Sequence, residues 1–165
     1  MMKWLIAAAA AVVLGGIVYL QLHSTKTMYV NGLALYTKLP NREYVLESDC
    51  YIFKFKAKDS SWPLIGSHVS VPALPQDVSQ AHVGEDLPDV RLLDVLHVGD
   101  HFRIASVRMD QSRKETTVTF EIVLADETTR KFPRLDAFWI MDHAPEKAGK
   151  APTILPSFAV MLGKE

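Results

Sequence analysis

The sequence has 165 residues, a formal net charge of −1 and a single cysteine. The near-zero net charge gives no sign of a basic surface for nucleic acid. A single cysteine cannot form an internal disulfide, so we expect the domain to be stabilised by its hydrophobic core. The 143 residues after residue 22 are enough for one hydrophobic core and too few for two comfortable ones.

The segment Trp4–Leu22 is apolar and holds no charged residue. As a helix with a rise of about 1.5 Å per residue it would span roughly 28 Å, close to the thickness of a bilayer core. Trp4 and Tyr19 lie near its two ends, where aromatic rings favour the membrane interface. The alternative is a cleaved signal peptide, but cleavage after Ala11 or Gly16 lacks either a long enough apolar core or a small residue at −3. The sequence therefore predicts an uncleaved signal anchor and a single-pass membrane protein.

Residues 1–3 form a short tail before this predicted anchor. We expect the tail to lie in the cytoplasm and the following domain outside it, which in a bacterium means the inner membrane and the periplasm. Ala7, Ala11 and Gly15 recur every four residues and would share one face of the helix. Such a face permits close helix packing in lipid, although alanine can also be neutral filling of an apolar helix.

A polar connector is expected at 23–32, followed by one β-rich domain over 33–165. Alternating apolar residues predict strands at Leu33–Lys38, Glu43–Leu46 and Cys50–Lys56. We expect Cys50 to be a buried small apolar residue, the usual role of a lone cysteine.

Another strand is predicted at Ser67–Val71. Residues 72–88 contain several prolines and carboxylates and predict an irregular acidic loop. Asp89–Leu96 fits either a short helix capped by Asp89 or a buried strand, and the pattern favours the helix.

An antiparallel meander is the clearest fold signal. Its strands are predicted at 101–109, 115–124, 128–132 and 137–141. The second strand directs Phe120 and its alternate neighbours to the core, and the neighbouring Thr119 to the other face. The apolar alternation of the first strand shifts by one residue after Ile104, which predicts a β-bulge.

A last apolar strand is predicted at Ser157–Leu162. Together these elements predict a mainly β protein, in which a transmembrane helix precedes a small antiparallel β-barrel or β-sandwich of SH3-like or OB-like size. This prediction of the fold class rests on the number and length of the predicted strands and not on a sequence motif.

The pair His97 and His101 flanks Asp100 and is the one weak candidate for a metal site. Gly99 between them indicates a turn, and histidines four residues apart share a face only on a helix. We therefore expect polar turn residues here and no bound metal.

A Ser–Lys protease would require a serine beside a lysine kept neutral by burial. The candidate serines are Ser24, Ser48, Ser60, Ser61 and Ser67. Lys54 and Lys56 follow a solvated strand face, and no serine lies in a nucleophile elbow. The eight glycines form no phosphate-binding pattern, so no catalytic residue and no cofactor is predicted.

These observations favour a non-catalytic, membrane-anchored subunit or adaptor whose extracytoplasmic domain binds another protein in a membrane assembly. Its expected partners are the lipid bilayer and a protein, and not nucleic acid. The predicted strands Leu33–Lys38 and Ser157–Leu162 are candidate docking edges if they lie at the border of the sheet. The alternative is a membrane-anchored hydrolase of the Ser–Lys type or a metal-binding enzyme.

Overall fold

The structure is a computed structural model that describes residues 25–57, 62–80, 82–112, 116–125 and 131–162. Within these residues, no helix has the length and the apolar character needed to cross a bilayer. The predicted anchor at 4–22 lies outside the described residues, and so do its packing face Ala7, Ala11 and Gly15 and its interface residues Trp4 and Tyr19.

The described chain is mainly β, with 44% of residues in strands and 9% in helices. Eleven strands and three short 3₁₀ helices are described: β1 Lys26–Tyr29, β2 Glu43–Leu46, β3 Cys50–Phe55, β4 Leu64–Gly66, η1 Val78–Gln80, β5 Val90–Leu96, β6 His101–Gln111, β7 Thr116–Leu124, β8 Leu135–Asp136, η2 Phe138–Ile140, β9 Met141–Asp142, η3 Ala144–Ala148, β10 Thr153–Ile154 and β11 Ala159–Leu162.

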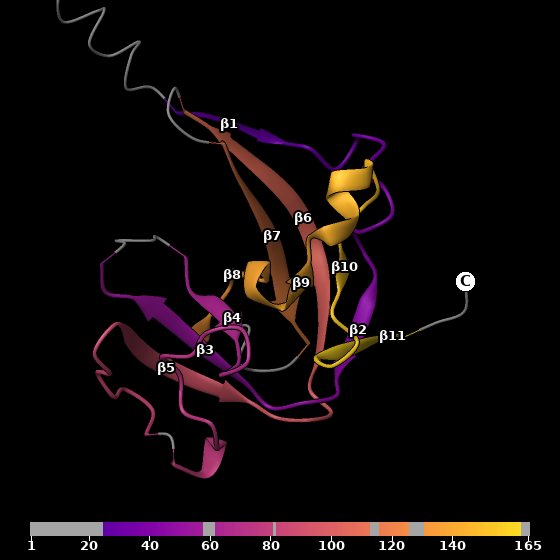
Figure 1. The fold of residues 1–165 in the computed structure, drawn as a ribbon. Coiled ribbons are helices and arrows are strands. Elements are labelled where there is room, and N and C mark those ends of the chain that lie inside the picture. Colours follow the sequence, from indigo (N-terminus) through magenta and orange to yellow (C-terminus); the bar gives the residue numbers. More distant parts are fainter. Residues whose placement is uncertain (1–24, 58–61, 81, 113–115, 126–130, 163–165) are drawn as a thin grey trace, which may run out of the picture.

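Nine of these strands form one sheet, in the order β11-β2-β6-β7-β8-β4-β3-β5, with β1 paired to β6 outside this path. Two strands pair with different parts of β6 on the side away from β7. β2 pairs with its first residues and β1 with its last four. β9 and β10 form a separate two-stranded sheet. Figure 1 shows the long β6–β7 pair curving from the end that carries β1 down to β11 and β2.

The bulge predicted after Ile104 is confirmed. The register of β6 on β7 shifts between Ile104 and Ser106, which leaves Ala105 as the extra residue. Both Ile104 and Val107 are fully buried, because the extra residue restores the core-facing phase after the slip. The predicted core face of β7 is also confirmed, with Phe120 fully buried.

Two adjoining hydrophobic clusters form the interior. The larger one packs around β6 and β7, and the smaller one gathers aromatic and aliphatic residues of β3 and β5. Cys50 at the start of β3 is fully buried, as predicted, and burial raises the pKa of its thiol to about 12.

The prediction of a strand at Leu33–Lys38 was wrong. This segment makes consecutive turns, in which Tyr36 N–H donates to Leu33 C=O at 2.8 Å and Leu39 N–H to Tyr36 C=O at 3.0 Å. Tyr36 and Leu39 are buried, so the apolar residues serve the core without forming a strand. The strand β1 lies inside the predicted connector instead, paired antiparallel to β6.

Two further elements differ from the predictions. Ser67–Val71 is a turn, closed by Val71 N–H donating to Ser67 C=O at 2.8 Å, and the strand precedes it as β4. Within the segment Asp89–Leu96, Val90–Leu96 forms the strand β5 and not the favoured helix. Pairing with β3 along six residues supplies β5 with backbone partners, and this tertiary contact decides between the two alternatives. The expected irregular character of 72–88 is confirmed apart from η1.

The later part of the meander was also predicted incorrectly. Lys131 and Phe132, the described end of the predicted third strand, lie outside any strand, and pairing resumes at β8 after Pro133. In place of a fourth strand at 137–141, η2 begins after Asp136, whose Oδ1 accepts the N–H of Phe138 at 3.0 Å. An aspartate that accepts a backbone N–H two residues ahead favours a turn over an extended chain.

Candidate protein-binding edge

The strand β11 is the last strand of the sheet path and pairs only with β2 among the described residues. Its register is antiparallel, from Ala159 opposite Leu46 to Leu162 opposite Glu43. The predicted docking strand Ser157–Leu162 therefore does lie at the border of the sheet. The other candidate, Leu33–Lys38, does not form a strand and offers no edge.

The direction of the backbone groups on β11 follows from one hydrogen bond. Glu47 N–H donates to Phe158 C=O at 2.8 Å, so residues 158, 160 and 162 alternate as the bonded partners of β2. The backbone groups of Ala159 and Met161 consequently face away from β2. Ala159 N–H donates to Leu155 C=O at 3.3 Å, and the N–H and C=O of Met161 find no backbone partner in the described part of the chain.

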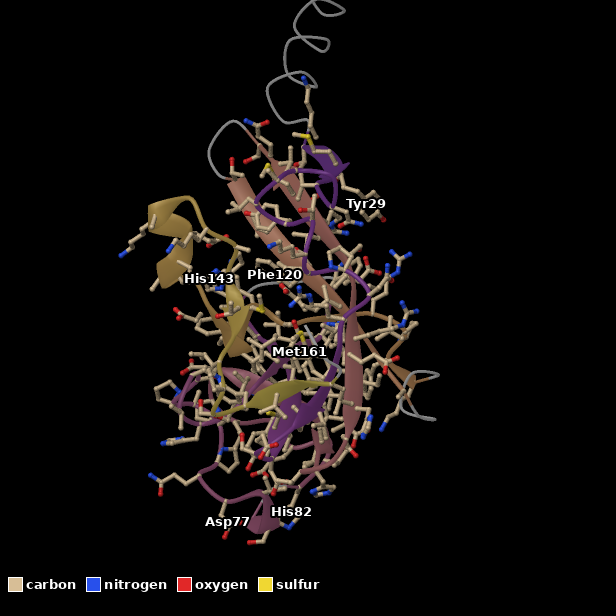
Figure 2. All side chains as sticks on the ribbon, turned by 90° about the vertical axis from the view of Figure 1, so that its right-hand side faces the viewer. Tyr29, Asp77, His82, Phe120, His143 and Met161 are labelled. Carbon is tan, nitrogen blue, oxygen red and sulfur yellow. The ribbon has the colours of Figure 1, made fainter. Side chains whose placement is uncertain are left out.

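The side chains of β11 make this edge apolar. Val160, Met161 and Leu162 are 40%, 36% and 39% exposed, while Ala159 at the start of the strand is buried. Natural edge strands are usually protected by charge, proline or a covering segment, and the sequence of β11 contains neither charge nor proline. Arg42, just before β2, contacts Met161, with its guanidinium 3.0 Å from the sulfur. Figure 2 shows Met161 on the face turned towards the viewer.

His97 and His101 lie on either side of the turn that joins β5 to β6, and both are exposed. The turn is closed by His97 N–H donating to Asp100 Oδ2 at 2.8 Å, with Gly99 at a φ of 93°. His97 Nδ1 lies 3.5 Å from Asp49 Oδ1. Among the described residues, no group of three or more His, Cys, Asp or Glu is placed to hold a metal ion.

The described serines of the protease alternative bond to the backbone. Ser48 Oγ donates to Ser157 C=O at 2.9 Å, and Ser67 Oγ accepts the N–H of Val69 at 3.2 Å. Lys56 forms an ion pair with Asp86 at 3.7 Å. The structure thus brings neither serine together with a lysine. Ser24, Ser60 and Ser61 lie outside the described residues.

Sequence reasoning missed a buried polar cluster on the face of β7 that was expected to be solvated. Thr119 is only 5% exposed, and the cluster also contains Ser106, Glu121 and Asp136. Ser106 Oγ donates to Glu121 Oε2 at 2.5 Å, and Arg134 lies 3.2 Å from the other oxygen of Glu121.

Trp62 covers this cluster, because two cations stack on its ring. The guanidinium of Arg108 lies 4.5 Å and that of Arg134 5.3 Å from the ring centroid. Burial raises the pKa of Asp136 to about 6, against the opposing effect of two backbone hydrogen bonds and of Arg108 and His143. No local pattern in β7 indicates this cover, because Trp62 comes from a distant part of the sequence.

The comparisons with known proteins add no family to this description. A scan against protein-family models and searches of curated proteins and of solved structures found no match to the chain.

Proposed function

We propose that this protein is a non-catalytic, membrane-anchored adaptor whose β-rich domain binds another protein by accepting a strand along β11. The observation that carries the proposal is the open edge at Met161, with an outward N–H and C=O and exposed apolar neighbours. A partner strand would pair with the backbone of β11 and cover these side chains, as in other cases of strand addition. Among the described residues β1 also pairs on one side only, but Lys26 protects its other side and β1 lies close in sequence to the predicted anchor.

The membrane part of the proposal is supported by the apolar sequence at 4–22 and by the residues near the start of the domain. β1 begins at Lys26, four residues after the predicted span. Met28, Tyr29 and Leu33 near this end are exposed apolar side chains, which suit a membrane surface. The domain is proposed to lie outside the cytoplasm, and Ala7, Ala11 and Gly15 to pack against a helix of the assembly. The strongly curved β6–β7 pair supports a small barrel of SH3-like or OB-like size.

The test is a proline at the outward-facing position of β11. Met161→Pro removes an N–H that does not bond to β2, so the sheet should persist while strand addition is lost. Met161→Ala is the matched control, because it shortens the side chain and keeps the N–H. Both variants should retain the circular dichroism of the wild type.

The readout is the mass of full-length protein solubilised in mild detergent, measured by light scattering and native electrophoresis. We expect the wild type and Met161→Ala to run with a bound protein, and Met161→Pro to run without it. A wild type with no bound protein would refute the adaptor function. A complex that survives in a folded Met161→Pro variant would refute strand addition at β11.

A further inference from the structure

A cleft of about 400 Å³ lies beside the start of β11. Three segments far apart in the sequence form its walls: Ser48 and Asp49 between β2 and β3, the loop 67–78 after β4, and Ser157 and Phe158 before β11. Asp77 of this loop lies at the opposite end of the molecule from Tyr29 of β1 (Figure 2). The cleft therefore lies away from the end where the predicted anchor would enter the domain.

Tyr51 of β3 contributes an unpartnered hydroxyl group to this cleft. Its side chain is only 2% exposed, and among the residues that the structure describes its hydroxyl has no hydrogen-bond partner. A buried hydroxyl without a partner is unfavourable, and such groups usually meet a ligand or water. Tyr51 lines the cleft together with Asp49 and Asp77. Burial raises the pKa of Tyr51, and the charges of Asp77 and Asp49 raise it further.

Asp49 and Asp77 are held in place through one oxygen each. Asp49 Oδ1 accepts the N–H of Val98 at 2.9 Å, and Asp77 Oδ1 accepts the N–H of Ser79 at 2.8 Å. The bond to Ser79 lowers the pKa of Asp77, so this carboxylate is charged at neutral pH. These bonds orient the two groups.

His68 adds another acceptor to the cleft. Its Nδ1 lies 2.6 Å from the carbonyl oxygen of Leu74, so in the neutral ring Nδ1 carries the proton and Nε2 accepts. Gln76 Nε2 lies 3.5 Å from this Nε2 at the rim. The lining contains neither lysine nor arginine, so its formal charge is negative. A ligand for this cleft must bring positive charge and several N–H donors.

The remaining walls are apolar. Pro75, Val78 and Phe158 line the cleft beside the carboxylates and can contact a methylene chain. We propose that the cleft binds a primary alkylammonium group, with the ammonium head among Asp49, Asp77 and the Tyr51 hydroxyl group and the alkyl stem on the apolar wall. Three N–H donors on one nitrogen match three separate acceptors, which the planar guanidinium of arginine cannot reproduce. The same chemistry is found in a lysine side chain and in a free polyamine.

The test is calorimetric titration of full-length protein in detergent with small probes. Nα-acetyl-lysine amide represents the protein source, and cadaverine represents the free amine. Nα-acetyl-arginine amide controls for the shape of the head, and Nα,Nε-diacetyl-lysine amide controls for its charge. We expect the first two probes to bind and the two controls to bind at least tenfold more weakly. Tighter binding of the lysine probe would identify a protein side chain as the source, and tighter binding of cadaverine a free amine; both support the proposal.

Variants locate the head group. Tyr51→Phe keeps the ring and should weaken the Kd about tenfold, and Asp77→Asn about 10- to 100-fold, as expected for lost hydrogen bonds to a charged group. Asp142→Asn is the matched control, because Asp142 also accepts a backbone N–H two residues ahead, from Ala144 at 2.9 Å, but lies outside the cleft. It should leave the Kd unchanged.

A wild type that binds neither amine would overturn the proposal, and so would equal binding of the arginine probe. Unchanged affinity in Tyr51→Phe or Asp77→Asn, or an equal loss in Asp142→Asn, would show that the amine binds elsewhere and overturn the site. Because binding of a small amine does not require a strand on β11, these results are independent of the Met161→Pro experiment.

Discussion

Replacing Asp136 by asparagine should stabilise the protein at neutral pH. Asp136 lies in β8 and is 8% exposed, and its Oδ1 accepts the N–H groups of Phe120 at 3.1 Å and Phe138 at 3.0 Å. Asparagine keeps an oxygen that can accept both bonds. What it removes is the charge, which burial disfavours strongly enough to raise the pKa of Asp136 from 3.8 to about 6.

The sign of the effect is set by proton binding. The folded protein holds this proton more tightly than the unfolded chain, so the stabilisation is complete below the unfolded pKa of 3.8 and is lost as the pH rises through about 6. A pKa difference of this size corresponds to about 3 kcal/mol, at about 1.4 kcal/mol per pH unit. Asp136→Asn cannot ionise and retains that free energy. The variant should therefore exceed the wild type in stability by up to about 3 kcal/mol at pH 8 and match it near pH 4.

The assay is urea unfolding of both proteins at a series of pH values, followed by tryptophan fluorescence. Asp86→Asn provides a control of opposite sign, because the hydrogen bond from Arg91 at 2.8 Å lowers the pKa of the exposed Asp86 carboxylate. Asp86→Asn should therefore be less stable than the wild type at neutral pH, and this difference should disappear in acid. An Asp136→Asn variant that is less stable than the wild type at pH 8, or a stability difference that does not change with pH, would refute this expectation.

Four further outcomes are expected. The full-length protein should remain with membranes after a carbonate wash, and recovery of a shortened soluble form would contradict the anchor. Ala11→Leu combined with Gly15→Leu should leave insertion intact but reduce the mass of the detergent-solubilised complex, because close helix approach is blocked; an unchanged mass would exclude this face. Phe120→Ala should lower the free energy of unfolding by about 3–5 kcal/mol, and Val160→Ala on the exposed edge by less than about 1 kcal/mol; equal losses in urea unfolding would contradict the assigned burial. Cys50 should react with a thiol reagent only after denaturation, since burial raises its pKa to about 12, and rapid labelling of the native protein would show otherwise.

Strands with strict alternation could be predicted from the sequence. Cys50–Phe55 and the β6–β7 pair combine alternating apolar residues with aromatic and β-branched side chains, and the slip after Ile104 located the bulge. Such patterns are local, although β3 and β7 are buried on both faces over part of their length. The edge strand β11 could be predicted from its run of apolar residues.

Elements decided by distant partners could not be predicted. Leu33–Lys38 alternates like a strand, yet no neighbouring strand pairs with it in the described chain, and it turns to bury Tyr36. Asp89–Leu96 has helical spacing, yet β3 supplies it with a pairing edge. Thr119 occupies the polar phase of β7 and is buried because Trp62 and two arginines cover that face.

The candidate sites were beyond prediction for the same reason. The apolar run Ser157–Leu162 predicts a strand but does not show which of its N–H groups faces outward. The cleft brings together Asp49, Asp77 and Phe158, which no spacing rule connects. In the sequence, Tyr51 of this cleft is indistinguishable from any other aromatic residue of an alternating strand.

The pairing of β1 with β6 has a mechanical consequence. A pull on the chain from its N-terminal side reaches the domain at Lys26, which lies opposite Gln111 at the far end of β6 (Figure 1). A force directed along β1 loads its bonds to β6 in shear, so that the bonds bear it at the same time and do not open one after another. We expect β1, whose four residues are all exposed, to detach first. Its detachment would lengthen the segment between the predicted anchor and the domain, while the core around β6 and β7 stays folded.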